Sequence, residues 1–495
     1  SSGINAEYMG SAIMGISFPS LSSLSSLLLA FLLLLFVVAK VLKSITNRSA
    51  PRLPPGPPKL PLLGNLHQLL GTLPHRSLRD LALKYGPIMH LKLGEVSTVV
   101  VSSSEAAMEV LKHHDTNFAD RPRLVAADVP SYGYADIAFS PYGDYWRQMR
   151  KICQFQLLSS NRVQSFRFIR EEEIYNFMKM ISATAKTSSP FNFTRHVFSL
   201  NYGITARVAF GAKSSHQEAY ISDIRELILY LGGFNLADLY PSIKILYRIS
   251  GLKSKMEKLH QRMDMVLEKI VSEHRQNRTA RIDGVEDLVD VLLKVQGQDG
   301  GLELADSNIK STISDMFSGG SDTVSTTVEW AMSEMLKNPS VMKTSQTEVR
   351  RVFEGKKNAE EAGVHELKRL KSVIKETLRL HPVIPLLLPR ECKESCEINR
   401  YEIPSKTRVL VNAWAIGRDP KCWKDSERFE PDRFLDSHID YKGTHFEFIP
   451  FGAGRRMCPG IAFAMAGVEI LLAQLLFHFD WQLPNGKKPD ELDMT

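Results

Sequence analysis

Residues 450–460 have the sequence PFGAGRRMCPG, and this stretch decides the fold class of the 495-residue chain. Its glycines permit a tight backbone path, and the apolar run from Ile461 to Phe477 behind it predicts a buried helix. Pro459 suits the first position of that helix, because a proline lacks the N–H that would have no partner there. Cys458 would then lie at a helix N-terminus, where N–H groups and the helix dipole stabilise the anionic sulfur that binds iron.

This stretch has two other interpretations. A single cysteine is most often a small buried hydrophobic residue. A dinucleotide- or phosphate-binding loop is excluded, because neither G-x-G-x-x-G nor G-x-x-x-x-G-K is present. Instead, the fixed positions of the haem-binding signature of cytochromes P450 are all matched, by Phe451, Gly454, Arg456, Cys458 and Gly460. The chain resembles this family, which implies a mainly α cytochrome P450 fold with a small β-sheet region, haem b as cofactor and Cys458 as the iron ligand.

Further residues resemble the family's contacts to the haem propionates. The segment Tyr145–Lys151 resembles the helix over the haem edge, in which an indole N–H and a guanidinium, here Trp146 and Arg150, bind a propionate. Arg390 and Arg456 match the remaining propionate contacts. Arginine suits a carboxylate because its fork donates two parallel hydrogen bonds.

A charge triad is also implied by the resemblance. Glu376 and Arg379 are three residues apart on one predicted helical face, a spacing that alone usually marks a solvated surface pair. Arg433 follows at the distance that the family shows. We expect the three to serve folding and haem retention rather than chemistry.

The chain from Ser307 to Lys337 predicts one long helix with two adjacent glycines, Gly319 and Gly320, in its middle. Each costs about 1 kcal/mol against alanine, so a compensating reason is expected. Close packing against another helix is the plain reason. The resemblance implies another, in which the glycines make room for dioxygen beside the iron and Asp322 and Thr323 relay protons.

An apolar stretch near the start predicts a membrane anchor. Residues 24–42 are nearly all Leu, Phe, Val and Ala, and no basic region precedes them as in a signal peptide. Lysines and arginines follow the run and none precedes it, so we expect a cytosolic body on a single span in the endoplasmic reticulum membrane. The expected parts are a lumenal segment 1–23, the anchor 24–42, a basic and Pro-rich hinge 43–61 and the catalytic domain 62–495.

The remaining patterns are coarser. Alternating apolar residues predict strands at 88–93, 98–101 and 408–411, and the middle of the chain is helical in period, including 254–275. Family members usually continue beyond the point that corresponds to Thr495, so we expect a final β-hairpin of the catalytic domain to be missing. The net charge of +7 comes with no nucleic-acid recognition motif, so no nucleic-acid partner is expected. The five cysteines lack disulfide or zinc spacing.

The resemblance implies a monooxygenase that inserts one atom of O2 into a lipophilic molecule, while the other leaves as water. We expect electrons from NADPH through a separate cytochrome P450 reductase, because the chain has no flavin or nicotinamide fingerprint. Arg147, Lys151 and Arg455 are candidate contacts for that reductase, and cytochrome b5 is a further expected partner. The alternatives are a haem-thiolate isomerase or dehydratase that does not use O2, and an inactive membrane-anchored binding protein.

The expected substrate is a plant specialised metabolite. An apolar pocket selects by shape, and a carboxylate substrate would normally call for a basic residue in its wall. The chain resembles plant microsomal members that hydroxylate sesqui- or diterpenoids, with indole alkaloids as the second possibility. The expected pocket walls are all apolar, although several of them fit an ordinary core equally well: Ile137, Phe139, Met316, Phe317, Val383, Ile384 and Leu387.

Overall fold

The computed structural model describes Ala30, Phe31, Leu34, Leu35 and Val38 and residues 51–492, except for 72, 188–189, 212–216, 232–233, 277–285, 298–303 and 484–485. The chain divides into two compact units, one formed by residues 1–50 and 60–62 and the other by 51–59 and 63–495. Most of the predicted anchor and all of segment 1–23 therefore lie outside the described residues. Among those described, one helix is long and apolar enough to cross a membrane, Ile461–His478, and it is largely buried in the larger unit.

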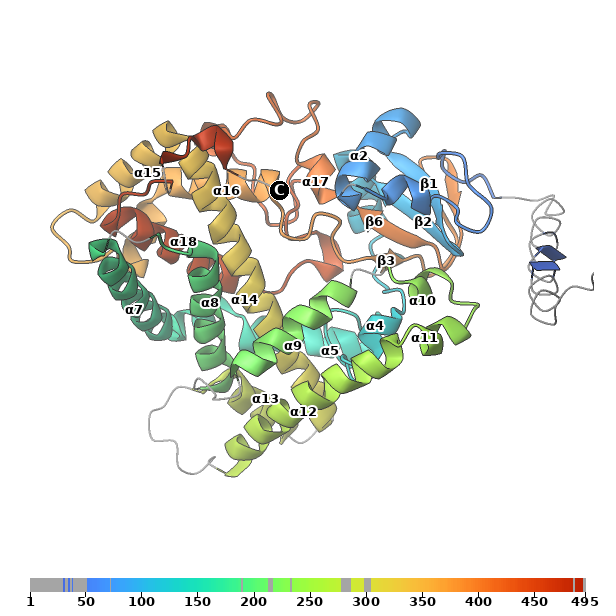
Figure 1. Cartoon of the computed structure of the whole chain (residues 1–495), viewed down its shortest axis with the longest axis horizontal. Coiled ribbons are helices and arrows are strands. Elements are labelled where there is room, and N and C mark those ends of the chain that lie inside the picture. Colours follow the sequence, from blue (N-terminus) through green and yellow to red (C-terminus); the bar gives the residue numbers. More distant parts are fainter. Residues whose placement is uncertain are drawn as a thin grey trace, which may run out of the picture. The chain divides into compact units, whose positions relative to one another are not determined.

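Helices make up most of the larger unit (Figure 1). They are α2 Pro74–Tyr85, α3 Ser104–Met108, α4 Val125–Asp128, α5 Asp144–Ile152, α6 Ser160–Ser165, α7 Arg167–Lys186, α8 Phe193–Phe210, α9 Gln217–Tyr230, α10 Leu236–Leu239, α11 Ile245–Ile249, α12 Leu252–Gln276, α13 Leu288–Gln296, α14 Asp306–Lys337, α15 Pro339–Val352, α16 Lys368–Leu380, α17 Ala413–Ile416 and α18 Ile461–His478. The helices predicted at 254–275, 307–337 and 461–477 are confirmed within two residues at each end.

A small sheet of four strands lies beside the helices, in the order β1-β2-β6-β3. Strands β1 (Ile88–Leu93) and β2 (Val96–Val101) form the predicted antiparallel hairpin. Strand β6 (Arg408–Val411) runs parallel to β2, and β3 (Arg390–Glu391) antiparallel to β6. A separate hairpin joins β4 (Cys396–Ile398) to β5 (Tyr401–Ile403). The strands predicted at 88–93, 98–101 and 408–411 are therefore confirmed.

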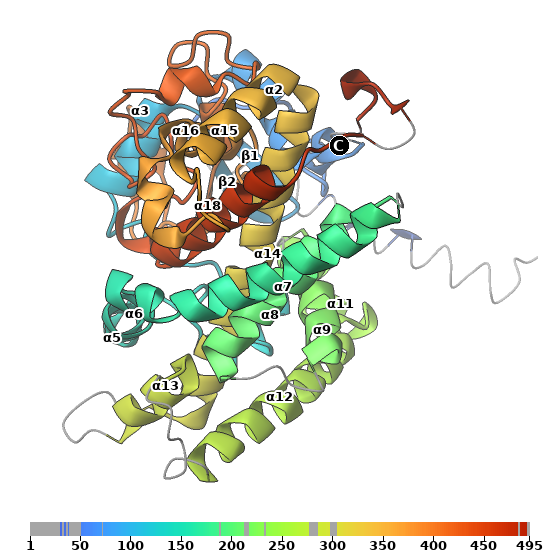
Figure 2. The same ribbon diagram turned by 90° about the vertical axis from the view of Figure 1, so that its left-hand side faces the viewer.

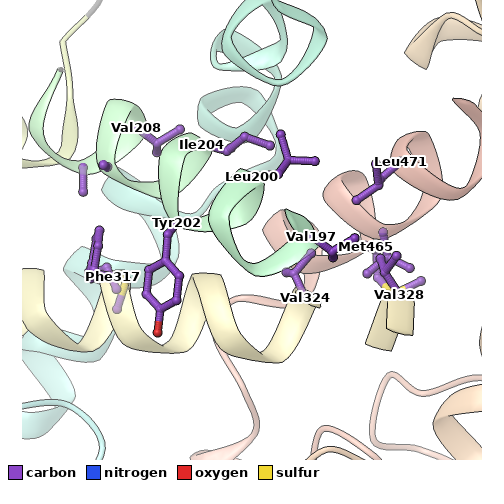
Figure 3. Close-up of a cluster of buried hydrophobic side chains, with 14 of the residues drawn as sticks. Val197, Leu200, Tyr202, Ile204, Val208, Phe317, Val324, Val328, Met465 and Leu471 are labelled. Atoms are coloured by element: carbon purple, nitrogen blue, oxygen red, sulfur yellow. The ribbon is translucent and has the colours of Figure 1, made fainter. Parts of the chain in front are cut away.

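Helix α14 runs through the helical body and packs against both α8 and α18. In Figure 2, α15, α16 and α18 form one half of the body and α9, α12 and α13 the other. The close-up in Figure 3 shows apolar side chains of α8, α14 and α18 meeting, among them Val197, Val324 and Met465.

Helix α14 is buried although it is rich in serine and threonine. The hydroxyls of Thr312, Ser321 and Ser325 each donate a hydrogen bond to the carbonyl four residues earlier, at 2.7 to 2.9 Å. Such bonds satisfy each hydroxyl within its own helix. The polar residues therefore enter the core without an unpaired donor, because every one of these hydroxyls has an acceptor.

Candidate functional site

The loop before α18 is held in a shape that only glycine permits. Gly452 and Gly454 both have φ of +70°. A Cβ placed on Gly454 would lie 2.2 Å from the carbonyl oxygen of Leu111 and 2.6 Å from Oδ1 of Asp115. The N–H of Arg455 donates a 2.9 Å hydrogen bond to the other oxygen of Asp115. Asp115, more than three hundred residues earlier in the chain, therefore fixes the loop.

Cys458 lies between this loop and α18. Its N–H donates to the Phe451 carbonyl at 3.0 Å, and its Sγ accepts the N–H of Gly460 at 3.3 Å. The expectation for Pro459 was wrong: α18 begins at Ile461, with Gly460 at its N-cap, and Pro459 lies in the preceding turn. The N–H that reaches the Cys458 sulfur belongs to Gly460, the N-cap residue of α18.

Three effects act on the pKa of the Cys458 thiol, and they do not all have the same sign. Burial raises the pKa of the Cys458 thiol, while the Gly460 N–H and the Arg150 guanidinium lower it. Burial is the largest of the three effects, so the protein alone favours the thiol rather than the thiolate expected from the sequence. A metal cation bound at the sulfur would reverse that balance, because a coordinating thiol loses its proton.

Three buried arginines gather around the loop. Arg390 donates to the Ala453 carbonyl at 3.0 Å and lies 3.5 Å from the Asp115 carboxylate. Arg456 donates to the carbonyls of Ala119 at 2.8 Å and Ser140 at 2.5 Å. The third, Arg121, donates to the carbonyls of Ala138, Leu388 and Pro389 at 2.8 to 2.9 Å.

These arginines carry more positive charge than their surroundings neutralise. Burial lowers the pKa of Arg456 to about 9 and that of Arg390 to about 10, and Arg390 lowers that of Arg456 further. The pKa of Arg121 is likewise lowered by burial and by Arg456 and Arg390. An anion with two carboxylates would relieve this mutual repulsion.

Trp146 and Arg150 lie on α5 beside the same group. The indole N–H of Trp146 donates a 3.0 Å hydrogen bond to the Ile137 carbonyl, so in this structure it is engaged by the backbone. The Arg456 guanidinium stacks on the indole at 4.2 Å, and that of Arg150 lies 6.0 Å from it. Trp146 therefore orients Arg456, which is a different arrangement from the direct propionate contact expected for its N–H.

The three residues of the predicted triad are in contact, and two of them are fully buried. Nε and Nη2 of Arg379 donate to the Glu376 carboxylate at 2.7 and 2.8 Å, and Nε of Arg433 donates to it at 3.0 Å. Neither side chain of the Glu376–Arg379 pair is exposed at all. Arg379 also donates to the carbonyls of Gly417 and Ser426 at 2.5 and 2.7 Å. The triad therefore ties α16 to the loop that precedes the cysteine segment.

The two glycines of α14 have different surroundings. A Cβ on Gly320 would meet the Phe463 ring at 3.2 Å and the Thr205 side chain at 3.4 Å. A Cβ on Gly319 would meet nothing within 4 Å. Close packing thus accounts for Gly320 but not for Gly319, which borders open space. Room for dioxygen beside Gly319 stays a prediction.

Asp322 and Thr323 also have different surroundings, because one bonds a side chain of another helix and the other bonds its own helix. Asp322 accepts a 2.7 Å hydrogen bond from the Tyr202 hydroxyl of α8. Burial raises the pKa of Asp322, while Tyr202 and Arg225 lower it. Thr323 is half-buried as a residue, and its hydroxyl donates an exposed hydrogen bond to the Gly319 carbonyl at 2.6 Å. An acid with a raised pKa next to a hydroxyl is suited to proton transfer.

The expected pocket walls do not all meet. A cavity of about 60 Å³ is lined by Phe139 and by residues from α4, α9 and α14, among them Leu227, Ser314 and Asp315. Ile137 and Met316 are buried, Val383 and Leu387 are half-buried, and Ile384 is 41% exposed. Phe317 contradicts the expectation: it is fully buried among the rings of Tyr202, Phe210 and Tyr220. It belongs to the core, because it faces α8.

Four residues of the site were missed. Arg121, Asp115, Tyr202 and Asp315 each act across more than a hundred residues of chain. No local spacing links them to their partners. The only signal in the sequence is the presence of charged or polar residues inside otherwise apolar segments, which is too common to single them out.

The residues present fit haem b. Cys458 offers a sulfur ligand and the three buried arginines suit two propionates, while Gly319 borders open space. The sequence model of the cytochrome P450 family matches residues 54–495, so the chain belongs to this family. It is a haem-thiolate monooxygenase, which confirms the enzyme class, the cofactor and the mainly α fold with a small sheet.

Curated plant relatives are similar over most of the chain. Desmethyl-deoxy-podophyllotoxin synthase of Sinopodophyllum hexandrum is 55% identical, with 91% of this chain and 89% of the relative covered. Tabersonine 6,7-epoxidase isoform 1 of Catharanthus roseus is 54% identical, with 90% and 88% covered. Premnaspirodiene oxygenase of Hyoscyamus muticus is 51% identical, with 91% and 90% covered. A solved zebra fish cytochrome P450 with progesterone has a TM-score of 0.70 at 26% identity, with 82% of this chain and 92% of that chain covered.

Proposed function

We propose that this monooxygenase hydroxylates a neutral, lipophilic sesqui- or diterpenoid. The observation that carries the proposal is the engagement of both carboxylates in the cavity wall, Asp136 and Asp315, by backbone N–H groups. Neither is a ready counter-ion for an ammonium group, and the rest of the wall is uncharged. Relatives of this chain act on terpenoids and on alkaloids.

Indole-alkaloid oxidation is the second candidate, favoured by the 54% identity to the tabersonine epoxidase. The two are separated by incubating terpenoid and alkaloid panels with the holoenzyme, reductase and NADPH. Terpenoid products one oxygen heavier are expected, and turnover of alkaloids alone would contradict the terpenoid assignment. Product formation without NADPH would instead point to an isomerase or dehydratase.

The proposed roles follow the geometry. Cys458 ligates the iron, and Arg390 and Arg456 hold the propionates with Trp146, Arg150 and Phe451 around them. Bound haem supplies the activation of dioxygen. Asp322 and Thr323 deliver protons beside Gly319 and Gly320. The triad of Glu376, Arg379 and Arg433 stabilises the fold. The proposed pocket walls are Ile137, Phe139, Met316, Val383, Ile384 and Leu387.

The iron ligand is tested by Cys458→Ala. The reduced carbon monoxide complex should lose its thiolate-type Soret band, because alanine offers no ligand. Cys422→Ala is the matched control, since Cys422 is exposed. The control should keep the thiolate-type band, and survival of that band in Cys458→Ala would refute the assignment.

We also propose that electrons arrive from NADPH through cytochrome P450 reductase, with cytochrome b5 as a second partner. Exposed basic side chains beside the cysteine loop support this: Arg455 is 51% exposed and Lys151 is exposed. Arg147 is also exposed, and it pairs with Asp144 as Arg455 pairs with Asp115 at 3.7 Å. Arg455→Glu with Lys151→Glu should raise the KM for reductase at low salt and leave substrate binding unchanged.

The proposed location is the endoplasmic reticulum membrane, with residues 24–42 as a single span and the body in the cytosol. Support comes from an apolar patch of Leu229, Leu236, Ile245 and Ile249, which are 82%, 58%, 59% and 70% exposed. Leu236 lies on α10 and Ile245 and Ile249 lie on α11, which contact each other (Figure 1), while Leu229 lies on α9. Isolated exposed apolar residues are normal, but a group of this kind suits a lipid surface.

A further inference from the structure

Residues 136–140 form an irregular segment whose backbone groups bond to side chains rather than to other backbone. On the donor side, the N–H groups of Ile137 and Ala138 both reach Oδ2 of Asp315 on α14, at 2.8 and 3.2 Å. The N–H of Phe139 reaches the Asp136 carboxylate at 3.1 Å. Acidic side chains therefore receive three successive N–H groups of this segment.

Basic and indole side chains meet its carbonyls. The Ile137 carbonyl accepts the Trp146 indole N–H at 3.0 Å and Arg456 at 3.3 Å. The Ala138 carbonyl accepts Arg121 at 2.9 Å. These donors belong to the group of residues assigned above to the haem edge.

One peptide unit connects the two sides. The carbonyl of Ile137 and the N–H of Ala138 belong to the same planar peptide. Its N–H end is fixed by Asp315, and its carbonyl end by Trp146 and Arg456. A shift at the N–H end therefore moves the carbonyl end, because the peptide is rigid.

Asp315 is also placed to affect the pocket. It lies four residues before Gly319, and therefore on the same face of α14. It lines the same cavity as Phe139. The segment that it holds carries the side chains of Ile137 and Phe139.

We propose that Asp315 is a positioning residue that sets the segment 136–140 and, through the Ile137–Ala138 peptide, both the pocket wall and the orientation of Trp146 and Arg456. The effect on haem rests on the proposed roles of those two residues. We attribute the effect to the hydrogen-bond acceptor rather than to the negative charge, because both N–H groups reach one oxygen and a neutral amide oxygen also has two lone pairs to accept them.

The test compares Asp315→Ala with Asp315→Asn in the full-length holoenzyme. Asparagine keeps an acceptor oxygen with two lone pairs, whereas alanine removes it. Hydrogen exchange of the Ile137 and Ala138 amides should become roughly ten- to a hundredfold faster in Asp315→Ala and stay near wild type in Asp315→Asn. Haem transfer to apomyoglobin should accelerate in the alanine variant only.

The matched control is Ser318→Ala, which changes a polar residue of the same cavity. The Ser318 hydroxyl bonds only carbonyls of its own helix, so exchange in the segment should not change. Unchanged exchange in Asp315→Ala, or an asparagine variant as impaired as the alanine variant, would overturn the proposal.

Asp315→Glu covers the case in which the alanine variant does not fold. It keeps the charge but moves the oxygen by one methylene, so faster amide exchange is expected than in Asp315→Asn. The reverse order would overturn the proposal. Amide exchange does not depend on the substrate, so a failure here is distinct from a wrong substrate class.

Discussion

The Tyr202 hydroxyl of α8 and the Asp322 carboxylate of α14 form a 2.7 Å hydrogen bond across the helix interface. The Arg225 guanidinium lies 5.3 Å from the Tyr202 ring. Burial raises the pKa of Asp322, and the Tyr202 bond and Arg225 lower it. Tyr202 therefore favours the ionised form of the acid, because its hydroxyl donates to the carboxylate.

Tyr202→Phe should raise the pKa of Asp322 further, because Arg225 alone would then oppose the effect of burial. The acid then stays protonated to a higher pH. Because a proton donor is active while protonated, we expect the high-pH limb of the coupling profile, measured as product per NADPH, to move up by about 1 pH unit. Hydrogen peroxide should decrease correspondingly at high pH.

Tyr220→Phe is the control for the tyrosine substitution. Tyr220 packs against the same Phe317 ring, but its hydroxyl does not bond Asp322. The control profile should match that of the wild type. A Tyr202→Phe profile that also matches it would exclude this tyrosine from control of Asp322.

The two glycines of α14 give a second prediction. Gly319→Ala enters open space and gains helix propensity, whereas Gly320→Ala must displace Phe463 or Thr205. Thermal unfolding should show Gly319→Ala to be more stable than Gly320→Ala by about 1 kcal/mol. Gly319→Ala should nevertheless lower coupling, because its methyl group occupies the space beside Thr323.

Equal stability of the two variants would contradict this division of roles. A Gly319→Ala enzyme with wild-type coupling would show that the open space is not used. Each variant is the control for the other, because both changes add one methyl group to the same helix.

Long or strongly patterned elements could be predicted from the sequence. The helix expected at 307–337 is observed at Asp306–Lys337, and the strand expected at 88–93 at Ile88–Leu93. The cysteine loop was predictable because its glycines, arginine and cysteine act within eleven consecutive residues. The contacts of Leu111 and Asp115 that hold this loop could not be predicted, because these residues lie more than three hundred positions earlier in the chain.

The failures have physical causes. Phe317 and Met316 are adjacent, but neighbouring helical residues point about 100° apart, so Phe317 faces the α8 core. Asp315 could not be paired with Ile137, which is 178 residues away. Hydrogen bonds between a helix and an irregular segment leave no periodic trace in the sequence.

A third prediction concerns membrane attachment. Deleting residues 24–42 should leave the reduced carbon monoxide spectrum intact, while part of the protein still sediments with vesicles through the apolar patch. Adding Ile245→Ser and Ile249→Ser should release that remainder, because these side chains are 59% and 70% exposed. Complete release by the deletion alone would contradict a role for the patch.

The control for this experiment is Leu83→Ser in the same deletion background. Leu83 is 79% exposed and lies on α2, outside the patch. Its replacement should leave sedimentation unchanged.

The orientation is tested separately with the full-length protein. Protease protection of the body in intact microsomes would contradict the cytosolic orientation.

The last prediction is that Gly454→Ala abolishes the thiolate-type spectrum. The new Cβ would lie 2.2 Å from the Leu111 carbonyl oxygen and 2.6 Å from Asp115, and the residue has φ of +70°. The backbone must move to relieve the clash, which disrupts the bond between Arg455 and Asp115. We expect a loss of about 3 kcal/mol in unfolding free energy together with the loss of haem.

Gly355→Ala is the control that separates the effect of the steric clash from the effect of the backbone conformation. Gly355 has φ of +75°, and nothing lies within 4 Å of its Cβ position. That control should cost about 1 kcal/mol and keep the normal spectrum. Equal losses in the two variants would mean that backbone conformation alone, rather than the contact with Leu111 and Asp115, makes glycine necessary at position 454.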